Sequence, residues 1–161
     1  GKKNPLRLFR NMLPAYMTAL GTQSSAATIP VTLEQTIRNG VHPDLAGFVI
    51  PLCATIHLSG STMKNVDCSM AIIFMSGMEI NFAQFAGFIM KLGIAMVAAP
   101  GVPGGAIMAA LGLLQSMLGF DETAQGLMIA LYIAMDSFGT ATNVTGDGAI
   151  AVIVDRINSG K

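Results

Sequence analysis

Two carboxylates, Asp136 and Asp147, lie in an apolar part of the chain together with Thr140 and Asn143. Positions 136, 140, 143 and 147 repeat at i, i+4, i+7 and i+11, which places all four side chains on one face of a helix. An ionisable side chain in an apolar membrane segment is costly and usually has a function, although either acid could instead be a structural cap. Asp136, Thr140 and Asn143 could therefore contact one small solute, with Asp147 farther along the same helix face.

The sequence offers no arrangement of nucleophile, base and orienting group that is typical of covalent catalysis, so we predict that the chain is not an enzyme. Cys53 and Cys68 lie in apolar surroundings without the spacing of metal ligands, so neither a disulfide nor a cysteine metal centre is expected. No cofactor is predicted beyond a coupling ion.

The composition is that of a protein in lipid rather than water. Of the 161 residues 52% are hydrophobic and 11% are charged, and the mean hydropathy is +0.60, whereas an average soluble domain is about a quarter charged. Nine basic and nine acidic side chains cancel, which removes any general case for nucleic-acid binding. We therefore expect a multi-pass protein of the plasma (inner) membrane that contacts lipid.

Glycine and small polar residues interrupt two apolar segments, at 54–62 (ATIHLSGST) and at 139–147 (GTATNVTGD). A helix broken at membrane depth leaves backbone groups unpaired, which proteins accept mainly where those groups line a cavity. Such broken helices hold solutes and ions in transporters. We predict two broken membrane helices with their breaks at these two stretches.

Short apolar arms precede each broken helix. Residues 4–20 and 30–38 are predicted to flank a polar tip at 21–28, with Pro30 beginning the return helix, where its missing N–H costs nothing. Residues 81–99 and 106–118 flank a second tip at 100–105. Arms of about 15 residues rise only about 22 Å, less than the roughly 30 Å hydrocarbon core, so both pairs are predicted to be re-entrant hairpins.

The predicted order is a first re-entrant hairpin at 1–40, a broken helix at 41–79, a second hairpin at 80–120 and a last broken helix at 121–161. Two such units, each crossing the membrane once, run in opposite directions. The predicted fold class is therefore an all-α polytopic membrane protein with an inverted repeat, which points to a binding site at the repeat interface.

Charge placement predicts the orientation, because basic residues gather on the cytoplasmic side of a membrane. The basic residues assigned to one side are Lys2, Lys3, Arg7, Arg10, Arg38, Arg156 and Lys161. The acidic residues assigned to the other side are Glu79, Asp121 and Glu122, with Lys91 as a basic exception. Both ends of the chain are therefore predicted to face the cytoplasm.

Three motifs resemble a known family. Residues 24–32 (SSAATIPVT) resemble the serine-rich first hairpin tip of the glutamate transporter homologues, the dicarboxylate/amino acid:cation symporters. Residues 101–104 (GVPG) match the second tip of that family, and residues 143–147 (NVTGD) match its last helix. The resemblance covers nearly the whole chain and implies the C-terminal part of a transport domain. It also implies a parent protein that is a homotrimer through a scaffold absent here.

The resemblance implies one solute site and at least one cation site. In the family, the position matching Asp136 binds the α-ammonium group of the substrate, that matching Asn143 its α-carboxylate, and that matching Asp147 sodium. The implied solute contacts are Ser24, Ser25, Ser61, Val102, Gly104, Asp136, Thr140 and Asn143. The implied cation contacts, partly through backbone carbonyls, are Cys53, Thr55, His57, Leu58, Asn143 and Asp147.

Two departures from the family pattern bear on the solute. Members that take acidic substrates hold the side-chain carboxylate with an arginine just before the threonine of the last helix or with one at the first tip, where this chain has Gly139 and Gln23. An unpaired carboxylate in a dry site is unfavourable. We therefore predict cation-coupled symport of a small neutral amino acid-like solute. The alternatives are an acidic amino acid or dicarboxylate symporter and a non-transporting membrane assembly module.

A further departure concerns the coupling ion, which is predicted to be sodium or a proton. His57-Leu58-Ser59 stands where many members have Asn-Met-Asp, and the missing aspartate matches a residue of a sodium site. His57 could titrate near neutral pH or be a neutral histidine bonded to backbone. Lys64 and Asp67, at i and i+3 in an apolar helix, could form a structural ion pair, or Lys64 could replace a coupling cation.

Overall fold

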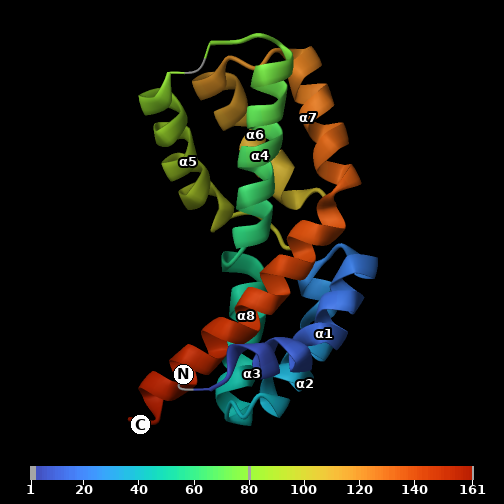
Figure 1. Cartoon of the computed structure of the whole chain (residues 1–161), viewed down its shortest axis with the longest axis vertical. Helices are drawn as coiled ribbons and strands as arrows, with labels where there is room; N and C mark the ends of the chain where they lie inside the picture. Colours follow the sequence, from blue (N-terminus) through green and yellow to red (C-terminus); the bar gives the residue numbers. More distant parts are fainter. Residues whose placement is uncertain (1–2, 80, 161) are drawn as a thin grey trace.

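The computed structural model describes residues 3–79 and 81–160, which form eight helices joined by turns, with no strand in that part of the chain. The predicted all-α class is thereby confirmed, while Lys2 and Lys161 lie outside the described residues. The helices are α1 (Pro5–Thr22), α2 (Ser25–Arg38), α3 (Pro43–Ile56), α4 (Ser59–Met75), α5 (Phe82–Met96), α6 (Gly105–Leu118), α7 (Glu122–Ala134) and α8 (Asp136–Asn158). Along the long axis, α4 to α7 form the upper half, and α1, α2, α3 and α8 form the lower half (Figure 1).

The first hairpin consists of α1 and α2 packed side by side, and its tip is shorter than predicted. Only Gln23 and Ser24 separate the two helices. Gln23 adopts a left-handed conformation with φ 53°, and the Ser24 hydroxyl accepts a 3.1 Å hydrogen bond from the amide of Ala27. This N-cap starts α2 five residues before Pro30, so the prediction that Pro30 begins the return helix is wrong.

The second hairpin consists of α5 and α6, and its longer turn spans residues 97–104. The Asn81 side chain caps α5 by accepting a 2.9 Å hydrogen bond from the amide of Ala83. Gly104, just before α6, has φ 72°, a conformation that favours glycine. This turn contains most of the tip predicted at 100–105.

The first span is Pro43–Met75, which is long and apolar enough to cross a membrane. It is interrupted at His57 and Leu58, between α3 and α4, inside the predicted stretch 54–62. A second candidate span is the pair α7 and α8, bent by 60° at Met135. Because α8 runs unbroken from Asp136, the prediction of a break at 139–147 is wrong.

The reason is that the small polar residues of α8 are satisfied within the helix. The hydroxyls of Thr140, Thr142 and Thr145 donate to the carbonyls four residues earlier, at 2.8 to 3.0 Å. Gly139 and Gly146 do not break the helix but allow other parts of the chain to pack closely against α8. A Cβ on Gly146 would lie 2.5 Å from the ring of His57, and Gly139 lies against the backbone of Gly60.

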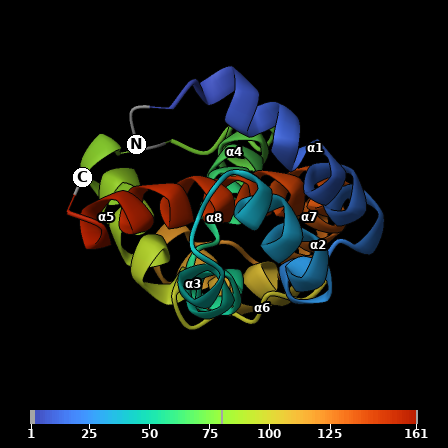
Figure 2. The ribbon, with the colours of Figure 1, turned by 90° about the horizontal axis from the view of Figure 1, so that it is seen from below.

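The apolar core is divided between the two halves. One cluster of buried residues joins α4, α5, α6 and α7, and two further clusters join α8 to α1, α2 and α3. Seen from below, α8 runs between α1 and α3 (Figure 2). Large apolar side chains such as Phe74, Phe82 and Ile94 are exposed, as expected for surfaces that face lipid or other helices.

The spans run in opposite directions along the long axis, α3 to α4 upward and α7 to α8 downward (Figure 1). The start of α1 and the end of α8 therefore lie at the same lower end, and the end of α4 lies at the upper end. Each hairpin points its tip toward the middle of the molecule, where the two halves meet.

Candidate functional site

The two hairpin tips contact each other. The hydroxyl of Ser24 donates a 2.9 Å hydrogen bond to the carbonyl of Gly101, and the amide of Ala26 donates a 3.2 Å bond to the same oxygen. Gly101 also lies so close to the carbonyl of Ala54 that a Cβ at this position would overlap it. Both tips and the end of α3 therefore meet at one point.

The break in the first span is closed by a side chain from α8. The Oδ1 atom of Asn143 accepts hydrogen bonds from the amides of Gly60 (2.8 Å) and Ser61 (3.3 Å), and its Nδ2 atom donates to the Ser61 hydroxyl at 2.9 Å. Leu58, at the N-cap of α4, has no side chain that could make these bonds. Asn143 thus satisfies amides that a helix N-terminus leaves unpaired.

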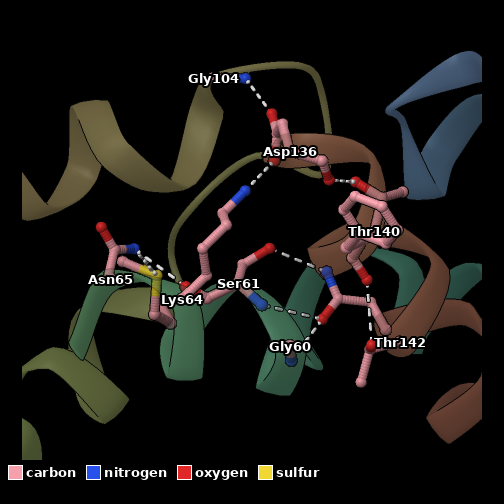
Figure 3. Close-up of polar contacts among 11 residues, drawn as sticks. Gly60, Ser61, Lys64, Asn65, Gly104, Asp136, Thr140 and Thr142 are labelled. Carbon is pink, nitrogen blue, oxygen red and sulfur yellow. Dashed lines mark hydrogen bonds and ion pairs between the residues drawn. The ribbon is translucent and has the colours of Figure 1, made fainter. Parts of the chain in front are cut away.

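Asp136, the first residue of α8, is 3% exposed and bonded through both carboxylate oxygens. Its Oδ1 atom accepts a 2.6 Å hydrogen bond from the ammonium group of Lys64 on α4, and its Oδ2 atom accepts a 2.8 Å bond from the amide of Gly104 (Figure 3). The Lys64 Nζ atom also lies 3.3 Å from the ring centroid of Tyr132. One carboxylate therefore joins α4, the second tip and the bend between α7 and α8.

A small pocket of about 10 Å³ lies between these elements. It is lined by Gln23, Ser25, Leu58, Ser61, Pro100, Gly101, Val102, Ala106, Tyr132, Asp136, Thr140 and Asn143. The first turns of α2, α4, α6 and α8 all contribute to it. Because this volume holds about one water molecule, a solute can enter only when a tip moves.

The residues predicted for cation binding gather at the other side of the break. The Nδ1 atom of His57 lies 2.7 Å from the Oδ1 atom of Asp147, which is 1% exposed. Leu58 and Cys53 are buried beside the break, and the carbonyl of Cys53 accepts the His57 amide. The hydroxyl of Thr55, by contrast, donates to the carbonyl of Leu52 on an exposed face, so the Thr55 side chain does not reach this group.

The donors available for a cation are one carboxylate and backbone oxygens. Within residues 3–79 and 81–160, no three His, Cys, Asp or Glu side chains lie together as a metal site. The end of α3 supplies carbonyls without intrahelical partners and the negative end of a helix dipole. Asp147 and the carbonyls near His57 are therefore the oxygen donors on this side of the break.

Most of the predicted solute residues come together, and one predicted pair is wrong. Ser25, Ser61, Val102, Asp136, Thr140 and Asn143 line the pocket. Ser24 and Gly104 lie beside it and are bonded to Gly101 and Asp136. Lys64 pairs with Asp136, not with its near neighbour Asp67, whose side chain is exposed.

The sequence interpretation missed Tyr132, which is buried and contacts Lys64 through its ring face. The helical spacing in the sequence could have identified Tyr132, because this residue is four positions before Asp136 and extends the helix face that continues through Thr140. The bend at Met135 turns α7 away from α8 but leaves Tyr132 on the pocket.

Known proteins resemble the chain over almost its full length. Residues 1–157 match the sodium:dicarboxylate symporter family. The chain is 33% identical to human excitatory amino acid transporter 1 over 160 residues, 33% identical to mouse excitatory amino acid transporter 5 over 158 residues, and 32% identical to an excitatory amino acid transporter of Caenorhabditis elegans over 154 residues. These matches cover 98%, 97% and 95% of the chain but only 29%, 28% and 30% of the relatives.

Proposed function

Because this chain belongs to the sodium:dicarboxylate symporter family, we propose that the longer protein carrying it performs secondary active transport, the symport of a small amino acid-like solute with a cation. The members of a symporter family are multi-pass membrane transporters and not enzymes. The observation that carries the proposal is the meeting of both hairpin tips, the break in the first span and the start of α8 at one pocket.

The electrostatics of the pocket suit a carboxylate-bearing solute. The N-termini of α2, α4, α6 and α8 converge on it, and a helix N-terminus carries a partial positive charge. Asn143 and Ser25 add polar groups, and Asp136 supplies a negative charge. We place the coupling ion, sodium, at Asp147 on the side of the break near His57, because broken helices commonly hold coupling ions next to the solute.

Two proposals for the solute differ in its charge: a neutral amino acid and an acidic amino acid. The neutral amino acid predicted from the sequence rests on the lack of an arginine at Gly139 and Gln23. Two observations favour the acidic alternative: the relatives are named excitatory amino acid transporters, and the buried ammonium group of Lys64 is bonded to Asp136, which lines the pocket.

The same proposal includes the arrangement in the membrane. We assign residues 1–40 and 80–120 to re-entrant hairpins and 41–79 and 121–161 to broken spans of an inverted repeat, with both chain ends in the cytoplasm. We also infer that the longer protein is a homotrimer assembled through helices outside this chain. The opposite directions of the two spans in Figure 1 support the inverted repeat.

Uptake into proteoliposomes tests the proposed function. The longer protein would be reconstituted and supplied with serine, alanine or aspartate under an inward gradient of sodium or of protons. Solute accumulation that collapses when the cation gradient is removed supports symport. No accumulation of any solute under either gradient would instead favour the non-transporting membrane assembly module.

A further inference from the structure

We propose that Lys64 determines the charge of the accepted solute: its ammonium group is the partner for a second carboxylate, as carried by an acidic amino acid. The inference rests on the proposed transport function and names the solute class of the same pocket. It concerns a residue that lies outside the motifs of the hairpin tips and of the last helix.

The position of Lys64 is the first argument. The side chain is 6% exposed and reaches from α4 to Asp136, where the Nζ to Oδ1 distance is 2.6 Å. A buried ammonium group requires a partner that balances its charge. The ring of Tyr132, 3.3 Å from Nζ to its centroid, adds a cation–π contact. The ammonium group is therefore held in place next to Asp136, which is its ionic partner and which lines the pocket.

Gly139 provides the second argument. A Cβ on Gly139 would lie 3.3 Å from Nζ and 3.4 Å from Cε of Lys64. The space that this glycine leaves is thus occupied by a positive charge from α4. A positive charge therefore lies next to Gly139 although the chain has no arginine at that position, and this supports a partner for a second carboxylate.

The two partners of the pair face different cavities. Asp136 lines the pocket between the tips, whereas Lys64 and Gly139 line a larger cavity of about 410 Å³ on the side of α4, α7 and α8. The ion pair forms part of the wall between them. A solute whose ammonium group enters the tip pocket therefore meets Asp136 first, with Lys64 directly behind that carboxylate.

Charge balance then selects the solute. When the ammonium group of an amino acid binds Asp136, it competes with Lys64 for the same carboxylate. A neutral amino acid would leave the Lys64 ammonium buried without an ionic partner, which is costly. An acidic amino acid carries a second carboxylate that takes the place of Asp136, so the ion pair is exchanged for two new pairs.

Replacing the charge tests this exchange in proteoliposomes of the longer protein. For Lys64→Met we expect the uptake efficiency kcat/KM for aspartate, relative to serine, to fall roughly tenfold to a hundredfold, because one hydrogen bond to a charged group is lost. Lys91→Met is the matched control, since Lys91 is an exposed lysine on α5, and the ratio should not change.

A second variant keeps the proposal testable if Lys64→Met does not fold. Lys64→Ala combined with Gly139→Arg moves the positive charge from α4 to α8, into the space that Lys64 vacates. Retention of the aspartate preference in this double variant supports the proposal. A folded double variant that prefers serine would overturn it.

The inference and the proposed function fail differently. Sodium-driven uptake by the unmodified protein that favours serine or alanine over aspartate, with the ratio unchanged in Lys64→Met, would overturn the role of Lys64 and leave symport standing. Absence of uptake of any solute would overturn the proposed function and the inference with it.

Discussion

The hydroxyl of Ser24 donates a 2.9 Å hydrogen bond to the carbonyl of Gly101, although the two residues are 77 positions apart in the chain. Ser24 ends the tip of the first hairpin, and Gly101 lies in the tip of the second. The bond joins the tips over a pocket that holds about one water molecule. Opening the pocket from either side must therefore break this contact.

Ser24→Ala should weaken both the contact between the tips and the N-cap of α2. We expect a loss of about 1 kcal/mol of stability from the cap alone. A thiol-reactive dye that reports exposure of the buried Cys53 and Cys68 on heating would measure it. Ser116→Ala is the control, because that exposed hydroxyl bonds only to its own helix, and an equal loss in both variants would contradict the role of the tip.

Asn143→Ala should destabilise the break in the first span and abolish transport. It leaves the buried amides of Gly60 and Ser61 without a partner, at about 1–3 kcal/mol for each unsatisfied group. Thr142→Ala, on the adjacent exposed face of the same helix, removes only a bond to the carbonyl of Phe138. Uptake by Asn143→Ala at the rate of Thr142→Ala would exclude Asn143 from the site.

Gly60→Ala and Gly112→Ala should have opposite effects on stability. A Cβ on Gly60 would meet the Gly139 backbone and lie 2.7 Å from Cβ of Thr142, and such overpacking costs about 1–3 kcal/mol. Gly112 on α6 has open space around it, so alanine there should gain up to about 1 kcal/mol through helix propensity. Thermal unfolding of the two variants measures the difference, and equal midpoints would refute the close contact of α4 with α8.

His57→Ala should weaken the response to sodium. The imidazole lies 2.7 Å from Oδ1 of Asp147 and fixes the orientation of that carboxylate, and loss of such a supporting group typically weakens metal binding by roughly tenfold to a hundredfold. The half-saturating sodium concentration for uptake measures the effect. His42→Ala is the control, because His42 is exposed at the start of α3, and a normal sodium response in His57→Ala would contradict the role of His57 in orienting Asp147 for the cation.

The sequence predicted the hairpins and the first break well because these features are local. Short apolar arms next to glycine, proline and serine define a tip wherever it lies in the fold. The second break was placed wrongly because Gly139 and Gly146 allow close packing of α8 against Gly60 and His57, as seen in the structure. Composition alone does not separate a glycine that ends a helix from one that lets another element approach.

The ion pair of Lys64 was also misassigned, for a related reason. Asp67 was the nearest acid in sequence, whereas the true partner, Asp136, is 72 positions away and is brought close by the packing of α4 against α7 and α8. Lys64 and Asp136 both lie in apolar segments, where charged side chains tend to pair. This tendency favours a buried acidic partner over an exposed neighbour, but only the fold shows which buried acid lies close enough.

Solute protection of two engineered cysteines tests the shared pocket most directly. In a background without Cys53 and Cys68, the longer protein would carry Ser25→Cys or Val102→Cys, one at each tip, or Met90→Cys on the exposed face of α5 as the control. Maleimide labelling would be timed with and without sodium and the transported solute. We predict that sodium plus solute slows labelling at both tips and leaves the control unchanged. Protection at one tip only, or at neither, in a protein that still transports would contradict a single pocket between the tips.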